Sequence, residues 1–211
     1  VEPRILSALT MSLERGSSFY YTSGLVAVHA DARNREAIWH ALENRNVYGT
    51  SGERILLYFN LLNGKNGMLP MGSEAEIESP PRFEVRAVGA FEQLPGCPDF
   101  VGERLSPKRM ERLCLGECYH PSDLRRPIER IEVVRIRKQH SPDEPVGELI
   151  EDPWRSFECP ASREGCQVSF EDSDWDPSRE TVYYVRALQQ PTLAIGGDPL
   201  RCERDEHGNC V

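Results

Sequence analysis

The stretch Gly24-Leu-Val-Ala-Val-His-Ala30 decides how the fold of this 211-residue chain is interpreted, because a helical pattern follows it at once. A continuous apolar run is typical of a strand covered on both faces in a parallel sheet. Asn34 is suited to cap a helix, along which Ala37, Ile38, Ala41 and Leu42 form one apolar stripe. Residues 47–53 then supply a loop, and residues 54–62 supply the next strand-like run. The segment therefore predicts a βαβ-type unit.

Beyond about residue 64, turn signals replace helical ones, so the rest of the chain is predicted to be mostly β. The predicted strands are Arg82 to Ala90, Glu129 to Arg137, Cys166 to Phe170 and Thr181 to Leu188. A short helix is predicted over Pro107 to Leu115, with Met110, Leu113 and Cys114 facing inward. Several short strands joined by long loops favour a sandwich.

The composition limits the partners. The chain carries 25 Lys and Arg against 34 Asp and Glu, a formal charge of −9 with a pI of about 5.2. Such a balance lacks the positive charge that neutralises phosphates, so we expect no nucleic-acid partner. The longest apolar run, residues 55–62, is far shorter than the roughly 20 residues that cross a bilayer, so no membrane span is expected.

Acidic residues concentrate in one segment, residues 141–180, which holds twelve Asp and Glu against three Arg. Within it, the alternate carboxylates Asp172, Asp174 and Asp176 have the donor chemistry of a calcium site. Pro177 and Tyr183 stand where an EF-hand loop needs Gly and Glu, so only calcium in another geometry is predicted. An exposed, charged turn between two strands is the alternative.

The five histidines are at least eleven positions apart, so no metal-ligand pair is visible. His29 closes the first strand, where ligands gather in α/β folds, and is a candidate ligand-binding residue; a packed imidazole is the alternative. The loop Gly49-Thr-Ser-Gly52 could present Thr50 and Ser51 to an anion, with Arg54 nearby. An ordinary tight connection is the alternative there. No residue is assigned a catalytic role.

Six of the seven cysteines form close pairs that disulfides could join: Cys114 with Cys118, Cys159 with Cys166, and Cys202 with Cys210. No pair has the Cys-x-x-Cys spacing of a zinc knuckle, and zinc or plain buried thiols are the alternatives. Disulfides form in oxidising compartments, so we expect a periplasmic or secreted protein. Both ends of the sequence also suggest a piece cut from a longer polypeptide.

Residues 24–55 closely resemble a segment of a bacterial family, the domain of unknown function numbered thirty-six-oh-four. The resemblance continues over most of the chain. It is carried by Pro70 to Glu74, Gly89 to Glu92, Ile128 to Arg135, Asp152 to Cys159, Tyr183 to Ala187, Leu200 to Cys202 and Gly208 to Cys210.

That family is similar to the PHP (polymerase and histidinol phosphatase) metal-dependent hydrolases, in which a distorted β/α barrel carries clustered metal ligands. The resemblance implies an α+β fold. Residues 1–62 would be the carboxyl-terminal end of a PHP-like β/α barrel, and residues 63–211 a mainly antiparallel, β-sandwich-like domain with cysteine-stapled loops. The chain would be the carboxyl-terminal portion of an uncharacterised hydrolase with phosphoesterase-type chemistry. Its divalent metal would bind upstream, so this fragment alone would not be catalytic.

Two functions remain open at this point. In the first, the partner of this chain is the upstream remainder of the same polypeptide, and the substrate is a small-molecule ester. In the second, the chain is a non-catalytic extracellular β-sandwich module for binding or assembly. Trp154 and Trp175, beside acidic loops, would then suit a carbohydrate or a protein partner, unless they belong to the core.

Overall fold

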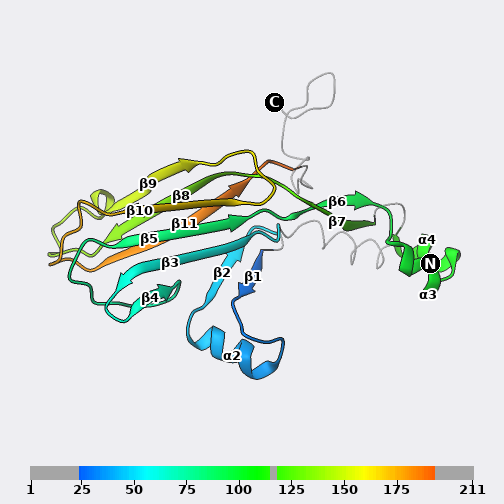
Figure 1. Ribbon diagram of the computed structural model, residues 1–211, viewed down its shortest axis with the longest axis horizontal. Helices are drawn as coiled ribbons and strands as arrows, with labels where there is room; N and C mark the ends of the chain where they lie inside the picture. Colours follow the sequence, from blue (N-terminus) through cyan, green and yellow to red (C-terminus); the bar gives the residue numbers. More distant parts are fainter. Residues whose placement is uncertain (1–23, 115–117, 193–211) are drawn as a thin grey trace, which may run out of the picture.

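The computed structural model describes residues 24–114 and 118–192, apart from the side chains of residues 113 and 114 (Figure 1). Strands dominate this part of the chain. They are β1 (Leu25–Val28), β2 (Val47–Thr50), β3 (Leu56–Gly64), β4 (Gly67–Pro70), β5 (Arg82–Val88), β6 (Phe91–Pro95), β7 (Tyr119–Arg125), β8 (Ile128–Arg137), β9 (Ile150–Glu158), β10 (Cys166–Glu171) and β11 (Thr181–Gln189). The helices are α2 (Arg35–Glu43), α3 (Asp99–Arg104), α4 (Pro107–Cys114) and the 3-10 helix η1 (Val146–Glu148).

The first unit contains the expected helix but not the expected parallel strands. Asn34 caps α2, because its side chain accepts a hydrogen bond from the backbone N of Ala37 at 2.8 Å. β1, however, pairs antiparallel with β2, in a segment that the sequence predicted as a loop. The chain reverses directly after α2, where Arg45 has a φ of 58° and the backbone N of His29 donates to Asn46 O. The predicted βαβ unit, with residues 24–30 and 54–62 as its strands, is therefore wrong, because β1 pairs with β2 and β3 lies in another sheet.

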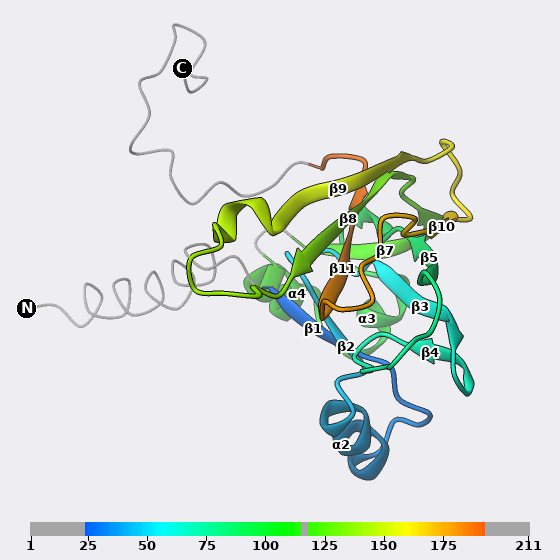
Figure 2. The ribbon, with the colours of Figure 1, turned by 90° about the vertical axis from the view of Figure 1, so that its left-hand side faces the viewer.

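Two antiparallel sheets form the body of the molecule, and this confirms a strand-rich α+β chain. One has the order β10-β5-β3-β4 and the other the order β11-β8-β9. Seen end-on, the two sheets lie face to face and diverge toward β11 and β4 (Figure 2). β3 runs through residue 62 and pairs with β5, so it belongs to the same sheet as the strands that follow it. The division into domains at residue 62 stays a prediction.

The core lies between these sheets and follows the strand period of two. On β5, Phe83, Val85 and Ala87 point inward and are buried. On β8, Ile131 and Val133 point inward from the opposite sheet and are fully buried. The strands predicted at 82–90, 129–137, 166–170 and 181–188 are confirmed as β5, β8, β10 and β11. Alternation was the correct signal because each of these strands has one face in the core.

The two long edges of the sandwich differ. At one edge β9 lies over β10, where Phe157 stacks on Phe170 at 5.4 Å and a disulfide joins Cys159 to Cys166. At the other edge, β11 ends the three-stranded sheet and β4 ends the four-stranded sheet. The three-stranded sheet is one strand short, and in the described chain no strand lies opposite β4.

A second ribbon, β6 paired with β7, extends from one end of the sandwich and leads to α3 and α4 (Figure 1). α4 confirms the short helix predicted from Pro107, with Met110 half-buried. Leu113 and Cys114, also expected to face inward, have side chains outside the described residues. No helix within the described ranges has the length and apolar character to span a membrane.

Candidate functional site

A groove of about 1280 Å³ opens between the two sheets at the β4 and β11 edges. Its floor consists of core side chains: Leu57, Phe59 and Leu61 alternate along β3, and Phe83 lies beside them on β5. β11 supplies one wall through residues 181–185. Residues 70–77, which connect β4 to β5, supply the other wall. The groove is thus the open side of the hydrophobic core.

The rim of this groove is acidic. Glu74, Glu76 and Glu180 line it, together with the single cation Arg45. Arg45 donates to Glu74 at 2.7 Å, and Lys138 donates to Glu180 at 2.8 Å from outside the lining. The hydrogen bond from Lys138 lowers the pKa of Glu180, so that carboxylate is ionised at neutral pH. An apolar floor below carboxylates suits a ligand with apolar and cationic groups.

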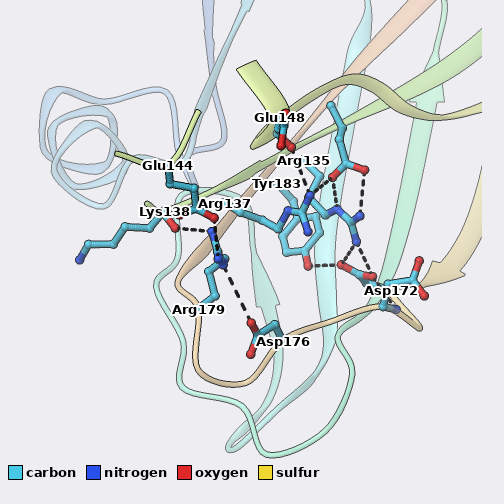
Figure 3. Close-up of polar contacts among 11 residues, drawn as sticks. Arg135, Arg137, Lys138, Glu144, Glu148, Asp172, Asp176, Arg179 and Tyr183 are labelled. Atoms are coloured by element: carbon cyan, nitrogen blue, oxygen red, sulfur yellow. Dashed lines mark hydrogen bonds and ion pairs between the residues drawn. The ribbon is translucent and has the colours of Figure 1, made fainter. Parts of the chain in front are cut away.

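A buried ionic network lies behind the wall formed by β11 (Figure 3). Arg135 on β8 donates from Nη1 to both carboxylate oxygens of Asp172, at 2.7 and 2.8 Å. It also donates from Nε and Nη2 to Glu151 on β9, at 2.6 and 2.9 Å. Tyr183 on β11 donates its hydroxyl proton to Asp172 at 2.5 Å. One guanidinium therefore binds two carboxylates. One of them, Asp172, directly follows β10 of the opposite sheet.

The Arg135 network has clear electrostatic causes and a structural character. Burial opposes the charge of Arg135, but the hydrogen bonds that it donates to Glu151 and Asp172 outweigh this effect and raise the guanidinium pKa. Burial, followed by the hydrogen bond to Asp172, raises the pKa of Tyr183 above its usual value. Both shifts favour the states that donate these hydrogen bonds, namely the charged guanidinium of Arg135 and the neutral hydroxyl of Tyr183. The arrangement links the two sheets, and the raised pKa values keep Arg135 and Tyr183 protonated at neutral pH.

The sequence contained a signal for Arg135 that was missed. Ile131 and Val133 point into the core, and Arg135 is the next position of the same period on β8. A charged residue at an inward position must find buried partners. The partners could not be identified in the sequence, because Asp172 lies 37 residues away along the chain.

Trp154 is part of this buried region and is not a free stacking platform. The guanidinium groups of Arg135 and Arg155 lie over its ring, at 4.4 and 4.3 Å from the ring centroid. It also contacts the core ring of Phe170 at 6.1 Å. Trp175 is half-buried in the turn after β10. The structure thus gives Trp154 the core role that the sequence left open.

His29 lies at the end of β1 beside a small cavity of about 330 Å³. Its Nε2 is 2.9 Å from the carbonyl oxygen of Leu57, and its ring packs on Tyr58 at a centroid distance of 4.9 Å. Asp31 and Asn60 also line the cavity. These contacts describe a packed, hydrogen-bonded imidazole, and a ligand role for His29 stays a prediction.

Thr50, Ser51 and Arg54 lie at the far end of the β1–β2 ribbon from His29. Thr50 pairs with Leu25, at the beginning of β1, whereas His29 follows Val28 at its end. The Thr50 hydroxyl accepts from the backbone N of Gly52 at 3.2 Å, and Ser51 and Arg54 are exposed. The structure does not bring these residues together with His29 into one site. Anion binding by the loop stays a prediction.

The three candidate calcium ligands have different surroundings. Asp172 is buried against Arg135, and it also accepts from the backbone N of Asp174 at 3.0 Å. Asp176 accepts instead from Ser178, and this hydrogen bond lowers the pKa of Asp176. Within residues 24–114 and 118–192, no group of three or more His, Cys, Asp or Glu side chains is placed to hold a metal ion. Calcium stays a prediction without a geometric basis in the described chain.

The predicted disulfide between Cys159 and Cys166 is confirmed. Cys118 is also disulfide-bonded, while the side chain of Cys114 lies outside the described residues. Cys202 and Cys210 lie outside them as well. The confirmed bond joins the end of β9 to the beginning of β10, so it staples the closed edge of the sandwich.

Comparison with known proteins yields a family without an established function. An uncharacterized protein of Chlamydia pneumoniae is 38% identical over 65 residues, which cover 31% of this chain and 10% of that protein. The chain thus spans only a small part of this curated relative. No solved structure matches. Residues 4–78 match the sequence model of a family described as a protein of unknown function, DUF3604. The relation to PHP hydrolases is not shown by these matches. The match supports a DUF3604 assignment for this part of the chain, which is less than half of its length.

Proposed function

We propose that this chain supplies a non-catalytic β-sandwich module to a larger polypeptide, and that the β1–α2–β2 unit is where the module joins it. One observation carries this proposal: the unit leaves its apolar side chains uncovered. Val26 is 69% exposed and Trp39 is 62% exposed, and Ala41 is the buried residue of α2. Ile38 and Leu42 of the same helix are also exposed. Apolar groups gathered in this way mark a surface that another body covers.

The family match supports this assignment of the joining surface. The matched residues, 4–78, include β1, α2 and β2 together with β3 and β4 of the sandwich, and they stop before β5. In the chlamydial relative the aligned segment is 10% of the protein, so most of that chain lies outside it. The unit with the exposed apolar side chains therefore lies within the part of the chain that matches the family model.

The larger body is proposed to be a PHP-like metal-dependent hydrolase with phosphoesterase-type chemistry. Its divalent metal would be bound upstream, where it would polarise an ester. The described residues hold no ligand group of that kind, so the proposal gives them no catalytic step. The disulfide Cys159–Cys166 supports a periplasmic or secreted location, because such bonds persist in oxidising compartments.

The joining surface is tested by comparing this chain with the longer gene product that contains it. Peptides from α2 should exchange amide hydrogens more slowly in the longer protein, while peptides from β8 should be protected in both. Trp39→Glu should lower the melting temperature of the longer protein and leave that of this chain unchanged. Glu36→Gln, on the same exposed helix, is the matched control and should change neither. Equal exchange of α2 in both proteins would contradict the proposal.

The hydrolase part has its own measurement. The longer gene product, supplied with Mn²⁺ or Zn²⁺, should hydrolyse bis-p-nitrophenyl phosphate, and this chain alone should not. Turnover by the 211-residue chain would show that the division between catalytic body and sandwich module is wrong.

A further inference from the structure

We propose that the open edge of the sandwich binds an extended, basic peptide segment of another protein, which adds to β11 as the missing fourth strand of its sheet. The four-stranded sheet faces a sheet of only three strands, and the groove occupies the place opposite β4. A strand added beside β11 would turn every second side chain into this groove. The proposal does not depend on the hydrolase assignment.

The backbone of β11 offers the hydrogen-bonding groups for such a strand. Lys138 N donates to Glu180 O at 2.9 Å, so Glu180 directs its carbonyl toward β8. The register continues with Thr181 opposite Arg137. Because every second residue of an antiparallel strand faces its neighbour, the backbone N–H and C=O groups of Val182 and Tyr184 also point toward β8. The N–H and C=O groups of Thr181, Tyr183 and Val185 then point away from β8. In the described chain, these outward groups have no backbone partner.

The dimensions of the edge fit a short strand. Residues 180–185, which include the beginning of β11, line the groove and span about 17 Å at a strand rise of about 3.3 Å per residue. This length accommodates a partner strand of five or six residues. The apolar floor of Phe59, Leu61 and Phe83 would contact its inward side chains. Backbone pairing would supply affinity, and the groove would select alternating apolar side chains.

Charge identifies the occupant as basic and as a separate chain. The groove is lined by Glu74, Glu76 and Glu180 against Arg45, and Lys138 pairs with Glu180 from outside the lining, so the rim keeps an excess of one carboxylate. The parts of this chain outside the structure do not complement it. Residues 1–23 contain two Arg and two Glu, and residues 193–211 contain two Arg against four Asp and Glu. Electrostatic complementarity therefore favours a partner segment with Lys or Arg at its outward positions.

The test uses a synthetic probe, acetyl-Lys-Val-Thr-Val-Lys-Val-Thr-amide, titrated into the full chain and followed by fluorescence anisotropy of a labelled copy. Val185→Pro removes an outward N–H and leaves the pairing with β8 intact, and proline is tolerated at such edge positions. We expect this variant to bind the probe at least tenfold more weakly. Val185→Ala keeps the N–H, and we expect it to bind within threefold of the unsubstituted chain.

A second pair of variants keeps the test valid if Val185→Pro fails to fold. Glu76→Lys changes the rim charge, and Glu78→Lys makes the same change two residues away, outside the groove lining. We expect Glu76→Lys to bind the probe several-fold more weakly and Glu78→Lys to bind it unchanged. A probe that is N-methylated at alternate amides should not bind the chain. A probe that does not bind, or that binds all variants equally, would overturn the proposal. So would a dimer abolished by Val185→Pro, or binding that appears only after residues 1–23 or 193–211 are removed, because the occupant would then be this chain itself.

Discussion

The two long edges of the sandwich show how the same pair of sheets can be closed on one side and left open on the other. At the closed edge, the disulfide Cys159–Cys166 and the stacked rings of Phe157 and Phe170 join β9 to β10. Arg135 adds an ionic link from its sheet to Asp172. At the open edge, the segment 70–77 and β11 border a groove of about 1280 Å³. The disulfide joins the sheets at the closed edge, whereas the groove separates β4 from β11 at the open edge, which leaves the open edge available for binding.

The largest effect is expected when the ionic link is broken. Arg135→Met would leave the carboxylate of Asp172 buried without its counter-charge, and removing one partner of a buried pair costs about 3–5 kcal/mol. Urea unfolding should show this loss in the free energy of unfolding. Arg137→Met is the matched control, because Arg137 is more exposed and lies 3.5 Å from Glu151. Equal effects of the two variants would show that the network does not hold the sheets.

The double variant Arg135→Met with Asp172→Leu sharpens the same point. If the loss comes from the uncompensated charge of Asp172, removing that charge as well should recover part of the stability. If the double variant is less stable than Arg135→Met alone, packing of the Arg135 side chain, including its contact with Trp154, is the larger contribution.

The disulfide should have the next largest effect. The bond closes a loop with a sequence separation of 7, for which the chain-entropy model gives about 2–3 kcal/mol. Replacing Cys159 with Ser and Cys166 with Ala should lower the free energy of unfolding by that amount. Probe binding at the open edge should remain within twofold. A loss of binding would mean that the two edges are coupled.

Much of the sandwich was predictable, and the reason is local. Phe83, Val85 and Ala87 alternate with polar neighbours, so the sequence alone predicts β5. β9 was missed because Asp152 and Pro153 interrupt its pattern, and these residues form a cis peptide bond within the strand. β2 was mistaken for a loop because Gly49 and Thr50 resemble a turn, and only the register with β1 makes them a strand.

The candidate site was less predictable, because its parts meet only through the packing of the sheets. Glu76 follows β4, whereas Tyr183 lies on β11, more than a hundred residues later. No spacing rule connects such positions. The aspartates 172, 174 and 176 were visible as a motif, but the partner of Asp172, Arg135, comes from another sheet. Sequence patterns reveal which face of a strand is buried, and they do not reveal which charges meet there.

A truncation in the groove tests whether the open edge contributes less to stability. Leu61→Ala removes a half-buried side chain from the groove floor, and Val133→Ala removes a fully buried one from β8. We expect Leu61→Ala to lower the free energy of unfolding by about 1 kcal/mol and Val133→Ala to lower it by about 2 kcal/mol, since the loss grows with the cavity that truncation leaves. Equal losses in urea unfolding would show that the groove floor is packed as tightly as the rest of the core.

The smallest effect concerns alkaline pH, where Tyr183 reports on the Arg135 network from the side of the open edge. Its pKa is raised in the folded state, so folding favours the protonated hydroxyl. The corresponding stability is complete below the unfolded pKa of about 10 and is lost as the pH rises above it. At pH 10.5 the loss is at most about 0.8 kcal/mol, because this pH is only slightly above the unfolded pKa, and the partial exposure of the hydroxyl makes the loss smaller.

Tyr183→Phe should therefore flatten the decline of unfolding free energy between pH 10 and pH 11. Tyr48, whose pKa is raised by burial, provides the comparison, because its hydroxyl donates to the backbone oxygen of Ile55 and not to a charged group. Tyr48→Phe should flatten the decline less. An identical slope in all three proteins would show that the Tyr183 hydroxyl does not report on the charge of Asp172. The alkaline titration therefore measures, through the Tyr183 hydroxyl, how strongly the ion pair of Arg135 and Asp172 is coupled to β11, which forms one wall of the groove.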